Sequence, residues 1–132
     1  GLDFAVKTLS EVYMPESTRQ LFIITVPHYF RRTWFDDKGV VLRSWQVKEQ
    51  TDINEYNHYF NFLHNYELLN RFLGRDKIIW GTWETDLPRE NFDVFFELVD
   101  KTDDGLHPGP KSHKQYADKL KKIIKEKYES TR

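Results

Sequence analysis

The residues best suited to chemistry are an aspartate and a histidine three positions apart, in a turn rich in glycine and proline. Asp104 and His107 lie within the run DDGLHPGPKSH, which covers residues 103–113. A carboxylate beside one ring nitrogen of an imidazole fixes its tautomer, so that the other nitrogen can act as a general base. Such turns lie at the surface, where a substrate can reach them. We therefore predict that Asp104 orients His107 for catalysis.

Two other interpretations of Asp104 and His107 stay open. In the first, the aspartate caps the backbone of a structural turn and the histidine is merely exposed. In the second, both bind a metal together with Asp103 and His113. The six-residue spacing of the two histidines matches no recognised zinc pattern, and a metal would need ligands from elsewhere. We expect no metal and no cofactor.

Length and composition favour one soluble globular domain over residues 1–132. The formal net charge is -1, which gives the whole chain no bias toward nucleic acid or anionic lipid. The absence of cysteine excludes disulfides, thiolate metal sites and cysteine nucleophiles. No apolar run approaches the roughly 20 residues that span a bilayer. We predict a cytoplasmic protein without membrane association and leave its oligomeric state open.

Hydrophobic periodicity predicts alternating helices and strands. The expected helices cover residues 2–13, a second segment that Asp52 and Glu55 start as a capping box and Gly74 ends, and a last segment that begins near His113. The expected strands cover residues 21–26 and 77–83, a loop covers 84–93, and residues 94–99 form a short strand or helical turn. The run of residues 21–26 lacks alternation, which is typical of a strand buried on both faces. This order predicts an α/β layered sheet.

Aromatic residues gather in two segments whose roles differ. The spaced residues of the second helix, Tyr56, Tyr59, Phe60, Leu63, Tyr66, Leu69, Phe72 and Leu73, favour a core face, with His58 and His64 beside them. Residues 32–35 and 40–45 flank a turn and predict a small hairpin. Its aromatic residues, Trp34, Phe35 and Trp45, have three open roles: covering the sheet edge, lining a cleft, or making a subunit contact.

The carboxyl ends of the predicted strands supply further candidate site residues. In open α/β sheets, ligands bind at this edge. Thr25 and His28 follow the first strand, and Trp83 follows the second. We predict that these three residues contact the substrate, and that the Asp104 and His107 turn lies on the same edge. A simple loop position is the alternative for His28.

The run from Asp104 to Pro108, followed by a helix with His113 and Ala117, resembles the last conserved block of SGNH (GDSL-type) hydrolases. In that family an Asp-x-x-His pair near the C-terminus supplies two members of a Ser-His-Asp triad. The resemblance implies that His107 is the general base and that Asp104 orients it. It also implies a flavodoxin-like three-layer α/β/α sandwich with a mainly parallel sheet. It covers most of the chain in architecture and the final block at residue level.

The chain departs from the SGNH pattern at the nucleophile. The family carries its catalytic serine in a Gly-Asp-Ser block, and none of the serines here lies in such a block: Ser10, Ser17, Ser44, Ser112 and Ser130. The family's Gly block is also missing, and residues 25–28 replace its Gly-x-Asn-Asp block. The resemblance thus implies the C-terminal portion of an SGNH-like domain that is truncated at its N-terminus. An upstream segment or a second chain would supply the serine.

The function that this resemblance implies is ester hydrolysis, on a small molecule or on a carbohydrate ester such as an acetylated sugar. The competing interpretation is a non-catalytic binding or assembly module with a degenerate SGNH-like fold. In that module the aromatic hairpin and the last helix would contact a partner. That helix is rich in lysine: Lys111, Lys114, Lys119, Lys121, Lys122, Lys125 and Lys127. A solvated basic face is the expected role, and phosphate or nucleic-acid contact is the alternative.

Overall fold

The computed structural model describes residues 2–13, 20–26, 34–35, 37–38, 41–42 and 55–129. The chain divides into two compact units. One contains Gly1–Phe22 and His28–Ile78, and the other contains Ile23–Pro27 and Ile79–Arg132. The prediction of one domain stays a prediction. Over the described residues, each helix is too short or too polar to cross a bilayer.

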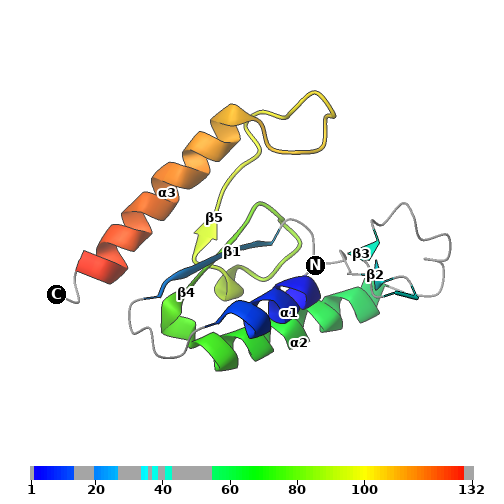
Figure 1. Ribbon diagram of the computed structural model, residues 1–132. Coiled ribbons are helices and arrows are strands. Elements are labelled where there is room, and N and C mark those ends of the chain that lie inside the picture. The colour runs from blue at the N-terminus through cyan, green and yellow to red at the C-terminus, as the bar shows by residue number, and fades with distance from the viewer. Residues whose placement is uncertain are drawn as a thin grey trace. The chain divides into compact units, whose positions relative to one another are not determined.

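The first unit contains two α-helices, which pack against each other (Figure 1). Helix α1 covers Leu2–Val12 and helix α2 covers Glu55–Leu73, so both predicted helices are confirmed. The ring of Tyr13, just after α1, lies 5.0 Å from the ring of Phe72, measured between centroids. Aromatic contact therefore joins the end of α1 to α2.

The buried face of α2 is narrower than the aromatic pattern predicted. Its buried apolar residues follow steps of four, three and four positions, which place them on one side of a helix: Phe62, Tyr66, Leu69 and Leu73. Phe60 and Phe72 are 62% and 48% exposed, so the prediction that they belong to the core face is wrong. The helix carries more apolar residues than one face can hold.

Gly74 ends α2, as predicted. Its φ of 91° lies in the region that favours glycine, and its N–H donates to the carbonyl of Asn70 at 3.0 Å. A short 3-10 helix, η2 (Arg75–Lys77), follows directly. The capping position predicted at Asp52 lies outside the described residues.

The predicted hairpin is present as two short strands. β2 (Trp34–Phe35) pairs antiparallel with β3 (Val41–Leu42), with Phe35 opposite Val41. Trp45 lies outside the described residues. The roles proposed for the hairpin aromatics stay predictions.

A small parallel sheet organises the second unit, in the order β1-β4-β5. Its strands are β1 (Phe22–Val26), β4 (Ile78–Thr82) and β5 (Val94–Phe95). β4 pairs in parallel with β5, with Gly81 opposite Val94. Together with the helices, this sheet confirms a mixed α/β fold and the positions of the first two predicted strands.

Burial differs between the strands because of their places in the sheet. Central β4 is buried throughout, and Ile79 and Trp80 are 0% exposed. Edge strand β1 leaves Ile23 46% exposed, so the prediction that this strand is buried on both faces is wrong. A run of apolar residues does not reveal whether a strand lies in the centre or at the edge of a sheet.

The loop after β4 returns to the sheet through Asp93. The backbone N–H of Trp80 donates to the Asp93 carboxylate, and the N–H of Asp93 donates to the Trp80 carbonyl, both at 2.9 Å. This loop contains a second 3-10 helix, η3 (Arg89–Asn91). Of the apolar segment 94–99, only Val94 and Phe95 form a strand.

Helix α3 covers Pro110–Glu129 and therefore begins three residues before the predicted start at His113. A proline suits the first helical position because the N–H that it lacks has no partner within the helix. The helix approaches β4 closely at Gly81, where an added Cβ would lie 2.2 Å from the Tyr116 hydroxyl. Only a residue without a side chain fits there.

Candidate functional site

Main-chain contacts close the loop between β5 and α3 at its neck. The N–H of Gly109 donates to the carbonyl of Asp100 at 3.0 Å, and that of Thr102 donates to the carbonyl of His107 at 2.9 Å. Between them, Lys101 and Pro108 form an antiparallel bridge. The neck therefore presents residues 102–107 as a compact tip.

Asp104 organises this tip with one carboxylate oxygen. Its Oδ1 accepts hydrogen bonds from the Thr102 hydroxyl at 2.6 Å, the Leu106 N–H at 2.9 Å and the His107 N–H at 3.0 Å. Gly105, with φ of 68°, supplies the left-handed residue that the turn needs. The contacts of Oδ1 are those expected if Asp104 stabilises a structural turn.

The second oxygen of Asp104 contacts the imidazole. Oδ2 hydrogen-bonds to Nδ1 of His107, the contact that the three-residue spacing predicted. A local turn does not require this second contact. The carboxylate thus both caps the backbone and fixes the ring, which leaves Nε2 as the nitrogen available to a substrate. The catalytic role of the pair stays a prediction.

The Asp104 carboxylate is held in its ionised form. The hydrogen bond from the Thr102 hydroxyl, the N–H groups of His107 and Leu106, and the His107 ring keep its pKa well below the usual range. The side chains of Asp104 and His107 are 45% and 52% exposed. A stable anion therefore faces an imidazole that solvent can reach.

The structure joins Thr25 and Trp83, two of the predicted substrate residues, through a chain of side chains. The hydroxyls of Thr25 and Tyr116 lie 2.5 Å apart. The ring of Tyr116 stacks on Phe96 at 4.3 Å between centroids, and Trp83 meets Phe96 edge-on at 5.3 Å. The two residues thus belong to one cluster at the carboxyl ends of β1 and β4. Their contact with a substrate stays a prediction.

This cluster and the Asp104 and His107 pair are separate arrangements within the second unit. Over the described residues, no hydrogen bond or ring contact links His107 to Thr25 or Trp83. His28, the third predicted substrate residue, lies outside the described residues. The structure therefore brings Asp104 to His107, and Thr25 to the cluster that contains Trp83, as two separate groups of residues.

Tyr116 is the residue of this cluster that sequence reasoning placed only on a core face. Burial raises its pKa, although its hydrogen bond with Thr25 acts in the opposite direction. A usable signal was Gly81, because glycine inside a strand often marks the close approach of another group. The Tyr116 hydroxyl occupies the space that a side chain at Gly81 would fill.

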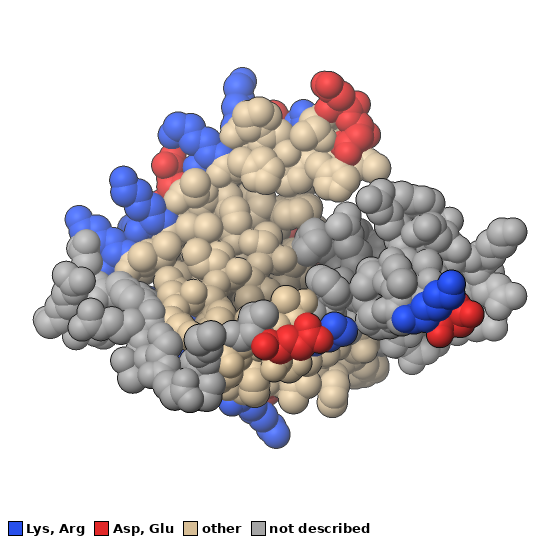
Figure 2. All heavy atoms as spheres, viewed as in Figure 1, with Lys and Arg blue, Asp and Glu red and all other residues tan. Residues whose placement is uncertain are grey.

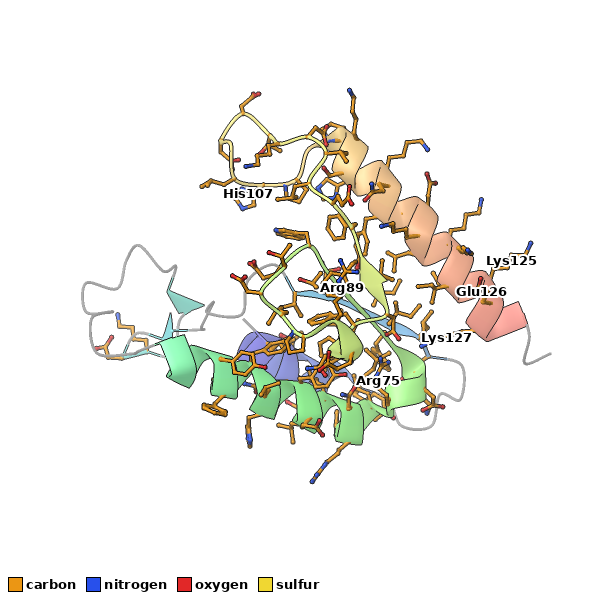
Figure 3. All side chains as sticks on the ribbon, turned by 180° about the vertical axis from the view of Figure 1, so that it is seen from behind. Arg75, Arg89, His107, Lys125, Glu126 and Lys127 are labelled. Atoms are coloured by element: carbon orange, nitrogen blue, oxygen red, sulfur yellow. The ribbon has the colours of Figure 1, made fainter. Side chains whose placement is uncertain are left out.

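A cavity of about 250 Å³ lies between β5 and α3, away from the imidazole. It is lined by Asp93, Val94, Phe95, Lys119, Lys122, Ile123 and Glu126. Figure 3 shows His107 on the loop before α3 and Glu126 near the opposite end of this helix. Because two lysines and two acids share its lining, the cavity favours neither sign of charge.

Two further kinds of group concern the described residues: a cluster of metal ligands, and a serine that could act as a nucleophile. Among residues 2–13, 20–26 and 55–129, no three histidines and acids come together as a metal site would require. Ser112 is 0% exposed, and the Ser10 hydroxyl donates to the carbonyl of Lys7. Burial therefore excludes Ser112 as a nucleophile that a substrate could reach.

Comparison with known proteins gives no match. No family model matches the chain, and no curated protein or solved structure matches it significantly.

Proposed function

We propose that Asp104 and His107 form the acid–base half of an ester-hydrolysing site of the SGNH type. The observation that carries this proposal is the division of labour within one carboxylate. Oδ1 of Asp104 fixes the turn, while Oδ2 holds Nδ1 of His107. The geometry matches that of a base and its orienting acid in a serine hydrolase triad.

The nucleophilic serine in this proposal comes from outside these 132 residues, on an upstream segment or a second chain. His107 takes the serine proton at Nε2 as the oxygen attacks the ester carbonyl. The imidazolium then returns this proton to the leaving alcohol, and water repeats the sequence to release the acid. Asp104 stabilises the imidazolium throughout, because its depressed pKa keeps it ionised.

The fold proposed for this site is the flavodoxin-like three-layer sandwich, of which these residues form the C-terminal portion. The support is a parallel sheet followed by an Asp-x-x-His turn and a last helix. Thr25, His28 and Trp83 would contact the substrate, a small-molecule or carbohydrate ester. The partly buried ring of Trp83 is an apolar surface of the kind that sugar rings stack on.

The charge of α3 favours the second candidate, a binding or assembly module. Figure 2 shows basic side chains along this helix, and its exposed lysines include Lys111, Lys121, Lys122 and Lys125. The whole chain carries a net charge of only -1, so this basic surface is local. An acidic partner would meet it by charge complementarity.

Covalent labelling separates the two candidates. The intact gene product that contains these residues would be treated with a fluorophosphonate and analysed by mass spectrometry. We expect one labelled serine, with labelling lost in His107→Ala and retained in His113→Ala. His113 is the matched control because it is also exposed and lies six residues away. A folded protein without labelling would contradict the hydrolase and favour the module.

A further inference from the structure

Asp100 lies four residues before Asp104. It makes several hydrogen bonds that no sequence motif predicted. Its Oδ2 accepts the N–H of Lys111 at 2.9 Å, and its Oδ1 accepts the N–H of Ser112 at 2.7 Å. These are the first two N–H groups of α3, because Pro110 has none. Asp100 thus caps the helix from the far side of the loop.

The Ser112 side chain completes this contact from inside the protein. Its hydroxyl accepts the N–H of Asp100 at 3.1 Å and lies 2.8 Å from Oδ1 and 2.9 Å from the carbonyl oxygen of Asp100. Ser112 is 0% exposed. A buried hydroxyl without these partners would be costly, which ties the start of α3 to Asp100.

Gly109 allows the two chain segments that form the neck to approach each other closely. A Cβ at this position would lie 2.6 Å from the carboxylate of Asp100. The N–H of Gly109 donates to the carbonyl of Asp100, and its own carbonyl accepts the N–H of His113. The Pro-Gly-Pro-Lys-Ser run after His107 therefore has a physical explanation, because each residue serves the closure around Asp100.

We infer that Asp100 is a positioning residue for the Asp104 and His107 pair, acting through the closed neck of the loop. The hydrogen bonds within the tip are local and exposed, whereas Asp100 binds a buried partner twelve residues away. From this anchor, the neck bonds lead directly to the backbone of His107. The catalytic consequence rests on the proposed function, while the structural consequence stands by itself.

Solution NMR of this chain tests the inference without a substrate. The readouts are amide hydrogen exchange at Leu106 and His107, and the carboxyl titration of Asp104. In Asp100→Ala we expect the two amides to exchange about tenfold faster or more, because a local opening is made easier. The pKa of Asp104 should rise toward its usual range as its N–H donors are lost. Slow exchange at Trp80 in β4 would show that the sheet is intact.

Three further variants keep the test decisive. Ser112→Ala removes the buried hydroxyl and should also speed amide exchange at Leu106 and His107. This variant provides the test if Asp100→Ala does not fold. Asp103→Ala changes an exposed acid of the same loop and should leave both readouts unchanged. Asp100→Asn keeps one oxygen acceptor and should recover part of the protection. Unchanged exchange and titration in folded Asp100→Ala and Ser112→Ala would overturn the inference.

Activity of the intact gene product then tests the catalytic consequence. We expect Asp100→Ala to lower kcat for ester hydrolysis at nearly constant KM, because the residue acts on the base and not on the substrate. An unchanged kcat in a protein with a loosened loop would overturn the link to catalysis. Failure of the fluorophosphonate reaction alone would count against the proposed function and leave the loop measurements valid.

Discussion

Asp100 and Asp104 are identical side chains four residues apart, and they serve opposite ends of one loop. Each carboxylate accepts hydrogen bonds from two backbone N–H groups and from one hydroxyl. Asp100 uses both oxygens within the protein, against a fully buried serine. Asp104 keeps one oxygen for a half-exposed imidazole. The sequence Asp-x-x-x-Asp thus contains a structural acid, Asp100, and Asp104, the acid that we propose orients His107.

The pKa values of both acids are lowered, for partly different reasons. Burial acts to raise the pKa of Asp100, but hydrogen bonds from Lys111 and Ser112 outweigh it, so its pKa is lowered. The pKa of Asp104 is held well below its usual range, chiefly by the Thr102 hydroxyl and the local N–H groups. Both are anions at neutral pH. What separates them is the neighbour that each anion faces.

The largest predicted effect is that of Asp104→Asn on hydrolysis by the intact gene product. The amide keeps the size of the side chain but does not hold the imidazole in the required tautomer. We expect kcat to fall by about 10⁴-fold, as for loss of the orienting acid in serine hydrolase triads. Steady-state hydrolysis of an activated ester measures it, with Asp103→Asn as control. A fall of less than about tenfold would assign Asp104 to the turn alone.

For Asp100, whose partner Ser112 is buried, we predict that Ser112→Ala lowers the stability of the whole chain. The N–H and carboxylate of Asp100 lose a buried partner, which costs about 1–3 kcal/mol in the free energy of unfolding. Urea denaturation followed by tryptophan fluorescence measures it. Stability equal to that of Asp103→Ala would mean that the neck contributes nothing to folding.

Two glycines sharpen the contrast between neck and tip. Gly109→Ala places a Cβ against the Asp100 carboxylate and should cost about 1–3 kcal/mol by overpacking. Gly105→Ala has open space but a φ of 68°, so only backbone strain of about 1–2 kcal/mol applies. Denaturation of both variants measures the costs, and NMR exchange at Lys111 should rise only for Gly109→Ala. Equal exchange in both would contradict a packed neck.

The smallest predicted effect is the response of the tip to acid. The folded pKa of Asp104 is below its unfolded value, so its stabilising contacts are complete above the unfolded pKa. They are lost only as pH falls through the lower, folded pKa. Chemical shifts of the Leu106 and His107 amides should therefore stay constant through pH 4, where ordinary aspartates titrate. A transition near pH 4 would show that the Oδ1 contacts are weak.

Local features of the fold and site could be predicted from the sequence, whereas distant contacts could not. Asp104 and His107 are three residues apart, so a turn alone brings them together. The contact of Asp100 with Ser112 spans 12 positions, and that of Thr25 with Tyr116 spans 91. Such pairs depend on loop closure and on how α3 packs. The exposure of Ile23 was missed for a related reason, since strand order sets it.

The most direct test of the central claim is chemical rescue of His107→Ala in the intact gene product. Ester hydrolysis would be measured with increasing imidazole in solution, alongside His113→Ala. If His107 is the general base, its removal abolishes hydrolysis, and added imidazole restores part of the rate, while His113→Ala behaves as wild type. Equal rates for the two variants, with no response to imidazole, would contradict a catalytic role for His107.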